Sequence, residues 1–202
     1  MRAAVLAAAL GLVASLFGSR PARSDDAGAP LLRKDMKNWA RAGAGKSPWG
    51  YTTAGTLTCA AAADRYVYEV FVGDGALHLE WRFQPAADPK KVPAASVTVR
   101  GTEGGEQCKI ALGAGCGSIS ATAQSSSDRI KTFEVKAAAA KPNPADEWNT
   151  ADITLAGKSV AVTLNGDPVS SFGNCSAAAG VISLNAEGAA IEFRNVRWKA
   201  GR

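Results

Sequence analysis

The chain has 202 residues, with 23 Lys and Arg against 18 Asp and Glu, and a formal net charge of +5. Nucleic-acid-binding proteins gather basic residues into runs or patches, and this sequence has no Lys/Arg-rich run with interleaved aromatic residues. We therefore exclude a nucleic-acid partner. The length suits one domain that buries a sizeable core without the help of a metal ion.

The N-terminus predicts a secretory signal peptide over residues 1–24. Arg2 gives a positive start, residues 3–18 are uncharged and mostly apolar, and Ala22 and Ser24 offer small side chains at the cleavage positions. The apolar run is shorter than the ~20 residues of a transmembrane helix, so a retained membrane anchor is the less favoured alternative. Cleavage would remove three arginines, leaving 20 basic against 18 acidic residues and a net charge of +2. We expect an exported protein, periplasmic or extracellular, with no membrane span after cleavage.

The rest of the chain has the pattern of an all-β protein. Residues 25–37 are polar and irregular, and we expect them to form a flexible leader to one domain over residues 38–202. From Trp39 onward, short apolar runs are separated by Gly, Pro, Asp and Ser, which is typical of a β-sandwich or barrel. We expect strands at 66–68, 77–83, 97–100, 108–112, 130–135, 153–155, 160–164, 180–185 and 191–198.

Two local features place the last strands. Asn165-Gly166 lies between alternating runs, and this pair supplies the positive φ angles that a tight hairpin needs. Phe193 and Val196 are both apolar but have opposite parity along the final run. One extra residue near Arg194-Asn195 would restore the alternation, so we predict a β-bulge there.

The four cysteines form an even set in an expected exported chain, which indicates two disulfides. Three pairings are possible. Cys108 and Cys116 flank residues 112–115, a plausible hairpin end, so we favour Cys108–Cys116 together with Cys59–Cys175. A metal site is the alternative, but the sequence has no C-x-x-C pair and a single histidine. We expect neither a metal site nor an organic cofactor, and leave a bound cation open.

The run 77–83 carries the first candidates for chemistry. Its apolar residues share one face of the predicted strand, and His78, Glu80 and Arg82 share the other. An imidazole, a carboxylate and a guanidinium on one sheet surface can bind sugar hydroxyls and move a proton. The alternative is a solvated strand face on which Glu80 and Arg82 form an ordinary ion pair of little energetic weight.

Five phrases follow one another along the chain: Phe71 to Arg82 (F-V-G-D-G-A-L-H-L-E-W-R), Glu147 to Thr150 (E-W-N-T), Val162 to Gly166 (V-T-L-N-G), Gly180 to Gly188 (G-V-I-S-L-N-A-E-G) and Ile191 to Arg197 (I-E-F-R-N-V-R). Their order and spacing over residues 37–199 resemble the 3-keto-disaccharide hydrolase domain family of secreted bacterial proteins. The resemblance implies an antiparallel β-sandwich of the concanavalin A-like jelly-roll type.

The resemblance also implies action on glycosides already oxidised at C3 of the sugar. A 3-keto group acidifies the hydrogen on C2, so a base can remove it. The enolate then expels the glycosidic oxygen from C1, and water adds afterwards. Such an enzyme needs a base near C2, a donor for the enolate oxygen and a proton for the leaving group. We therefore expect a saccharide as ligand or substrate.

Six residues receive roles on this basis, with His78, Glu80 and Glu187 as catalytic candidates and Arg82, Trp148 and Asn185 as substrate-binding candidates. Family members often read Q-D-H-G where this chain reads Asn185-Ala186-Glu187-Gly188, so Glu187 stands in place of a histidine. Either Glu187 has taken over its role or the chemistry is lost. Glu187 is equally expected to be a turn residue without a catalytic role. The alternative for Trp148 is that its ring packs in the hydrophobic core.

Two functions follow from these features. The leading one is cleavage of 3-keto-glycosides, with His78, Glu80, Arg82 and Glu187 lining one concave face. The alternative is a non-catalytic carbohydrate-binding or envelope-associated structural module, since the same fold hosts both. Convergence of His78, Glu80 and Glu187 at one cleft would favour catalysis, and a Glu187 that points away would favour binding. The sequence predicts neither the exact sugar nor the oligomeric state.

Overall fold

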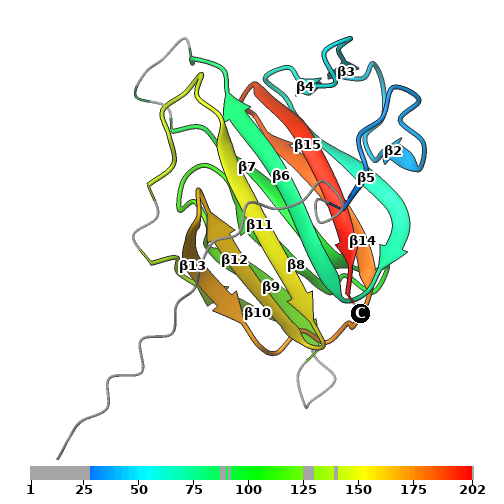
Figure 1. Ribbon diagram of the computed structural model, residues 1–202, viewed down its shortest axis with the longest axis vertical. Helices are drawn as coiled ribbons and strands as arrows, with labels where there is room; N and C mark the ends of the chain where they lie inside the picture. Colours follow the sequence, from blue (N-terminus) through cyan, green and yellow to red (C-terminus); the bar gives the residue numbers. More distant parts are fainter. Residues whose placement is uncertain (1–27, 87–89, 91, 125–129, 139–140, 202) are drawn as a thin grey trace, which may run out of the picture.

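Fifteen strands and no helix occur in the part of the chain that the computed structural model describes, residues 28–86, 90, 92–124, 130–138 and 141–201 (Figure 1). They form two sheets in which all neighbours are antiparallel. This confirms the predicted antiparallel β-sandwich. These residues also contain no helix long and apolar enough to cross a membrane.

The first sheet, called sheet A, has eight strands in the order β13-β12-β11-β6-β15-β4-β3, with β1 paired to β15 beside that path. Its strands are β1 (Ala29–Pro30), β3 (Trp49–Tyr51), β4 (Leu57–Cys59), β6 (Gly75–Phe83), β11 (Asn149–Ala156), β12 (Ser159–Leu164), β13 (Asp167–Phe172) and β15 (Ile191–Ala200).

The second sheet, called sheet B, has seven strands in the order β10-β9-β8-β7-β14-β5-β2. Its strands are β2 (Trp39–Arg41), β5 (Ala63–Val72), β7 (Ala95–Gly101), β8 (Gln107–Ala111), β9 (Ile119–Gln124), β10 (Ile130–Val135) and β14 (Gly180–Glu187). The expected runs from 66 to 198 coincide with β5 to β8, β10 to β12, β14 and β15, because alternation of apolar and polar residues is the period of a half-buried strand.

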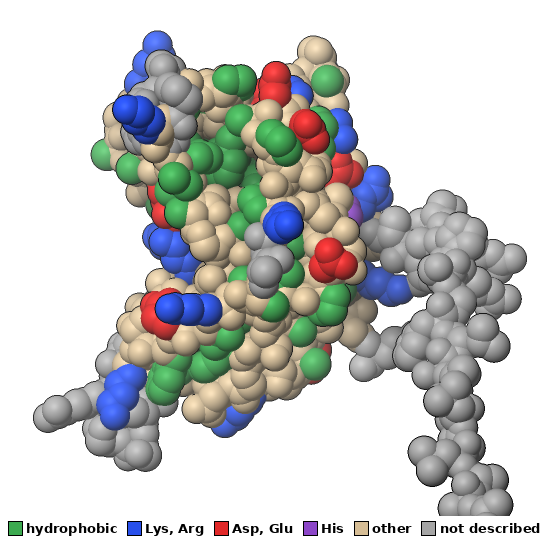
Figure 2. All heavy atoms as spheres, turned by 90° about the vertical axis from the view of Figure 1, so that its left-hand side faces the viewer, with side chains coloured by type: hydrophobic (Ala, Val, Ile, Leu, Met, Phe, Trp, Pro, Cys, Tyr) green, Lys and Arg blue, Asp and Glu red, His purple; other side chains and the backbone are tan. Residues whose placement is uncertain are grey.

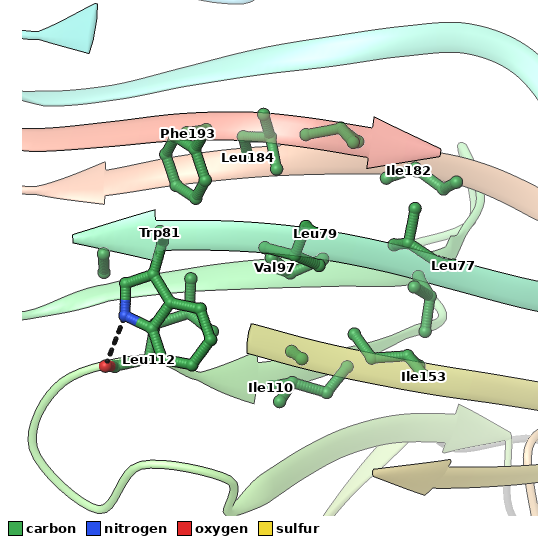
Figure 3. Close-up of a cluster of buried hydrophobic side chains, with 14 of the residues drawn as sticks. Leu77, Leu79, Trp81, Val97, Ile110, Leu112, Ile153, Ile182, Leu184 and Phe193 are labelled. Atoms are coloured by element: carbon green, nitrogen blue, oxygen red, sulfur yellow. Dashed lines mark hydrogen bonds between the residues drawn. The ribbon is translucent and has the colours of Figure 1, made fainter. Parts of the chain in front are cut away.

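The hydrophobic core lies between the two sheets (Figure 3). On β6, Leu77, Leu79 and Trp81 are fully buried, and they face Val97 and Ile110 of sheet B. The Trp81 indole Nε1 donates a hydrogen bond to the carbonyl oxygen of Leu112 at 3.2 Å, which satisfies its one polar atom inside the core. Burial on one side of each strand leaves the other side of each sheet free to carry polar groups.

Both local features predicted for the last strands are confirmed. Asn165 and Gly166 have φ angles of 49° and 91°, and they reverse the chain between β12 and β13. The pairing of β15 with β6 shifts register between Arg194 and Arg197, and Asn195 has a φ of 50°. The extra residue returns Val196 to the buried side, where it is 1% exposed.

The expected flexible leader over residues 25–37 is wrong for part of its length. Ala29 and Pro30 pair with Trp198 and Arg197 at the edge of β15, and Leu31 and Leu32 are buried in the core. Two adjacent leucines supply enough apolar surface to anchor the segment. The expected signal peptide, residues 1–24, lies outside the described residues.

The favoured disulfide pairing, Cys108–Cys116 with Cys59–Cys175, is also wrong. All four cysteines are buried free thiols, and the sulfur of Cys108 lies 3.0 Å from that of Cys175. Cys108 and Cys116 do flank a hairpin end, but Cys108 is on the core side of β8. Its side chain therefore meets the segment that follows β13 and contacts the cysteine there.

Candidate functional site

The outer face of sheet A carries three of the predicted site residues. His78, Glu80 and Arg82 alternate with the buried side chains of β6, so they point away from the core. Each forms a pair with the residue directly opposite on a neighbouring strand: His78 Nδ1 with Asp152 Oδ1 at 2.8 Å, Glu80 Oε2 with Arg194 Nε at 2.6 Å, and Arg82 Nε with Glu192 Oε2 at 2.8 Å.

These pairs set the protonation of the face. The hydrogen bond to Asp152 raises the pKa of His78, while burial acts in the opposite direction. Partial burial raises the pKa of Glu80, but hydrogen bonds from Asn195 and Arg194 outweigh it and hold that pKa below its ordinary value. The face is thus a ladder of charges matched between strands. The expected ion pair between Glu80 and Arg82 is wrong in its partners, because each of these residues pairs with a residue of β15 instead.

Trp148 belongs to the same face. The guanidinium carbons of Arg194 and Arg82 lie 3.8 Å and 4.8 Å from the centre of its ring. Cations this close to an aromatic ring are attracted by its π electrons. The ring is therefore already in contact with two arginines, and it lies on the opposite side of the sandwich from β14.

Glu187 and Asn185 lie on sheet B. In β14 the residues Ile182, Leu184 and Ala186 are buried, so Ser183, Asn185 and Glu187 point outward. The structure therefore does not bring His78, Glu80 and Glu187 to one cleft, because their strands belong to different sheets and all three face away from the core. Register within one strand is readable from the sequence, whereas the partnership of strands far apart in the chain is not.

A polar network surrounds Asn185. Its Nδ2 donates to Ser96 Oγ at 3.1 Å and to Thr98 Oγ1 at 3.0 Å, and its Oδ1 accepts from Ser183 Oγ at 3.1 Å. Ser96, Thr98 and Ser183 are buried. Buried hydroxyls need such partners, so the network holds the Asn185 amide in one orientation.

Glu187 extends this network with an ion pair. Its Oε1 accepts from Ser96 Oγ at 2.7 Å and lies 2.8 Å from Lys109 Nζ. Partial burial raises the pKa of Glu187, but the hydrogen bonds from Lys109 and Ser96 outweigh it. The pKa of the carboxyl is thus below its ordinary value, and the group is a carboxylate at neutral pH.

An open depression of about 440 Å³ lies over these residues. In Figure 2, where the molecule is turned to show the edge with β10 and β13, the outline is hollowed on the side of sheet B. The depression is lined by Ala42, Gly43, Ala63, Asp64, Arg65, Thr98, Gln107, Lys109, Asn185, Ala186 and Glu187.

One wall of the depression is fixed by Asp64, whose side chain is 4% exposed. Its carboxylate accepts hydrogen bonds from Arg41 Nε at 2.7 Å and from Trp49 Nε1 at 3.2 Å. The bond from Arg41 is the main reason that the pKa of Asp64 lies below its ordinary value. Arg41 also donates to the carbonyl of Gly45 at 2.7 Å, so the pair holds the segment that carries Ala42 and Gly43.

The arrangement suits a neutral polyol. It offers a carboxylate acceptor, an ammonium donor, an amide and hydroxyl groups on one hollowed surface, and a carboxylate beside an ammonium can also move a proton. Within the described ranges no group of three His, Cys, Asp or Glu side chains is placed to hold a metal ion.

Three further polar residues of this face, Ser96, Thr98 and Lys109, were not predicted from the sequence. The signal was present, because each alternates with core residues of β7 or β8 and must face outward. It was hidden by topology, since only the pairing of β7 with β14 brings Ser96 beside Asn185.

Comparison with known proteins identifies the domain. Residues 31–199 match the sequence model of a domain described as 3-keto-alpha-glucoside-1,2-lyase-like. The chain belongs to this 3-keto-disaccharide hydrolase family. The resemblance of the five sequence phrases is thereby confirmed, and the match covers both sheets.

Solved structures share the fold of this family member at low sequence identity. A candidate glycosyl hydrolase from Parabacteroides distasonis ATCC 8503 is 17% identical with a TM-score of 0.62, over 85% of this chain and 98% of that one. The Bacillus licheniformis beta-glucanase is 12% identical with a TM-score of 0.61, over 86% and 97% of the two chains.

A carbohydrate-binding module, CBM66 from Bacillus subtilis, is 12% identical with a TM-score of 0.58, over 81% of this chain and 96% of that one. At these identities the likeness establishes the concanavalin A-like sandwich alone. No protein with a curated description matches the chain at a significant level.

Proposed function

We propose that this protein acts after export, in the periplasm or outside the cell, and cleaves the glycosidic bond of 3-keto-glycosides in the depression of sheet B. The observation that carries the proposal is the Glu187–Lys109 pair beside the Asn185 network, in a member of a family whose description names 3-keto-glucoside lyase chemistry. The side chain of Glu187 is 34% exposed, whereas that of Asp64, the other carboxylate lining the depression, is 4% exposed and held by Arg41 and Trp49.

The reaction begins with removal of the C2 proton by the Glu187 carboxylate. The electron pair of the C2–H bond forms a C2–C3 double bond, and the C3 carbonyl becomes an enolate oxygen that Lys109 Nζ stabilises by a hydrogen bond. The enolate then re-forms the carbonyl, a C1–C2 double bond forms, and the C1–O bond breaks. The proton on Glu187 passes to the leaving oxygen.

Water completes the reaction. Its hydroxyl adds to C1 and a proton from solvent adds to C2, which gives the 3-keto-sugar; the aglycone has already left in the elimination step. Asn185 and Thr98 line the depression and orient sugar hydroxyls in this proposal, while the fully buried Ser96 holds Asn185 and Glu187 in position beneath them. The paired carboxylates of an ordinary glycosidase are not needed for this route.

A non-catalytic sugar-binding role is the second candidate. It is favoured by the two contacts that tie Glu187 to Ser96 and Lys109, since a carboxylate with a lowered pKa is a weak base. It is also favoured by the criterion stated from the sequence. His78 and Glu80 lie on sheet A and Glu187 points outward from sheet B, so the three do not meet at one cleft and His78 cannot assist Glu187.

Release of a chromogenic aglycone from a panel of 3-keto-glucosides by the purified protein tests the proposal. We expect turnover that falls by roughly 100-fold or more in Glu187→Gln, because general base catalysis contributes about this much. Glu134→Gln removes an exposed carboxylate of β10 outside the depression and is the matched control.

Two other outcomes would overturn the proposal. Loss of turnover in Glu80→Gln with full activity in Glu187→Gln would place the base on sheet A instead. Absence of turnover with saturable binding of unoxidised sugars would assign the protein to the binding class.

A further inference from the structure

Cys108 and Cys175 are side by side although they are 67 residues apart in the sequence. Their sulfur atoms are 3.0 Å apart, and the two residues are 2% and 3% exposed. A disulfide has an S–S distance of about 2.05 Å, so a small side-chain adjustment separates this contact from a covalent bond. Cys59 and Cys116 have no such neighbour among the sulfur contacts of the described residues.

A buried arginine lies beside the pair. Arg100 has a φ of 58° at the register shift between β7 and β14, and the shift turns its side chain into the end of the sandwich. Its Nη2 donates to Asp74 Oδ1 at 3.0 Å and to the carbonyl of Gly157 at 2.9 Å. Its Nε and Nη1 are buried without a hydrogen-bond partner, and Arg100, Cys108 and Cys175 line the same small cavity.

The surroundings distinguish these two thiols from the others. The hydrogen bond with Cys108 lowers the pKa of Cys175 against the effect of burial, and the positive charge of Arg100 lowers it further. Burial raises the pKa of Cys59 and of Cys116 to about 11 in each case. The thiolate is the reactive form, so Cys175 is the most readily activated of the four thiols.

We propose that Cys108 and Cys175 are a dithiol pair that closes to a disulfide when the chain meets an oxidising thiol–disulfide pool. While the chain folds and Cys175 is still accessible, its thiolate attacks a small disulfide oxidant, such as oxidised glutathione, and forms a mixed disulfide with release of one thiol. Cys108 then loses its proton and attacks the mixed disulfide at the Cys175 sulfur. The second thiol leaves, and the oxidant has taken up both electrons.

The cross-link would join two parts of the candidate site. Cys108 precedes Lys109 on β8, while Cys175 lies in the segment that leads into β14, which carries Asn185 and Glu187. A bond between residues so far apart restricts the unfolded chain strongly. Closure therefore stabilises the fold and fixes the two strands that hold the ion pair.

The test is refolding of the full chain in a glutathione redox buffer, which lets mispaired disulfides rearrange. Free thiols are then alkylated in denaturant, and the peptides are mapped by mass spectrometry. We expect one cross-linked peptide pair that contains Cys108 and Cys175, with Cys59 and Cys116 alkylated. Reduction should lower the melting temperature by roughly 5–15 °C.

Matched variants separate this pairing from a general effect of reductant. Cys59→Ala and Cys116→Ala should keep the cross-link and the shift, whereas Cys108→Ala should lose both. Alkylation of all four thiols, or a cross-link through Cys59 or Cys116, would overturn the proposal. The map of the unaltered protein decides the matter even if Cys108→Ala does not fold. Enzyme activity is not the readout, so the result is independent of the proposed function.

Discussion

Lys109 and Glu187 face each other across an intervening strand. The Lys109 Nζ lies 2.8 Å from Glu187 Oε1, although β7 separates β8 from β14 in sheet B. The pair passes over Ser96 of β7, whose hydroxyl donates to the same carboxylate oxygen at 2.7 Å. Three strands thus fix one carboxylate, and each contact can be removed by a single substitution.

Lys109→Met should shift the acid limb of the pH profile of kcat/KM. The hydrogen bond and charge of Lys109 help to hold the pKa of Glu187 below 4.5, against the effect of burial. The carboxylate is the active form, so activity is full above this pKa and is lost as pH falls through it. Without Lys109 the limb should move to higher pH, and turnover should fall by about 100-fold through loss of the enolate donor. An unchanged limb would contradict the assignment of Glu187 as the base.

Asn185→Ala should destabilise the fold, since it leaves the buried hydroxyls of Ser96, Thr98 and Ser183 without their amide partner. Loss of a partner for buried polar groups costs about 1–3 kcal/mol. Urea denaturation of the purified variant measures the loss. Thr154→Ala, at an exposed position on β11, should change stability by less than about 0.5 kcal/mol. Equal effects of the two changes would show that the network has no role.

Asp152→Asn should lower the pKa of His78, because the hydrogen bond from the imidazole to Asp152 raises it above 6.5. Because its pKa is raised on folding, protonated His78 stabilises the folded protein below about pH 6.5. This contribution to stability is lost as the pH rises through the pKa of His78 in the folded protein. The stability gap between the unaltered protein and the variant should therefore be larger at about pH 5 than at about pH 8.5. The chain has one histidine, so its NMR titration gives the pKa directly. The same His78 pKa in the unaltered protein and in the variant would contradict the hydrogen bond between His78 and Asp152.

Asp64→Asn should destabilise the protein at neutral pH by about 1–3 kcal/mol, because Arg41 loses its charged partner. The pKa of Asp64 in the folded protein is below 3.8, so its contribution is present above that value and is lost as pH falls through the folded-state pKa. Urea midpoints of the two proteins should therefore converge in acid. Asp167→Asn, at an exposed position, is the control. A gap that does not depend on pH would exclude an electrostatic origin.

Most of the fold was predictable because its signals are local. Alternation in the run 77–83 depends only on the strand itself, and the Asn165-Gly166 turn and the bulge at Asn195 depend on a few neighbouring residues. The packing of Leu31 and Leu32 was not predictable in the same way, since a short apolar pair in a polar segment has no period to identify it.

The candidate site was predictable only in part. The outward direction of Glu80 and Glu187 follows from parity within β6 and β14, but the sheet that each strand joins follows from long-range pairing. The same limit applies to the cysteines. Spacing along the chain favours Cys116 as the neighbour of Cys108. In the structure the segment that connects β13 to β14 brings Cys175 beside Cys108 instead.

The most direct measurement follows the hydrogen on C2 of a 3-keto-glucoside. The purified protein is incubated with substrate deuterated at C2, and the aglycone and sugar products are analysed by mass spectrometry and NMR as the reaction proceeds. We predict that aglycone release slows with the deuterated substrate and that the product sugar carries solvent hydrogen at C2. Aglycone release with deuterium fully retained at C2 would contradict proton abstraction as the step that opens the glycosidic bond.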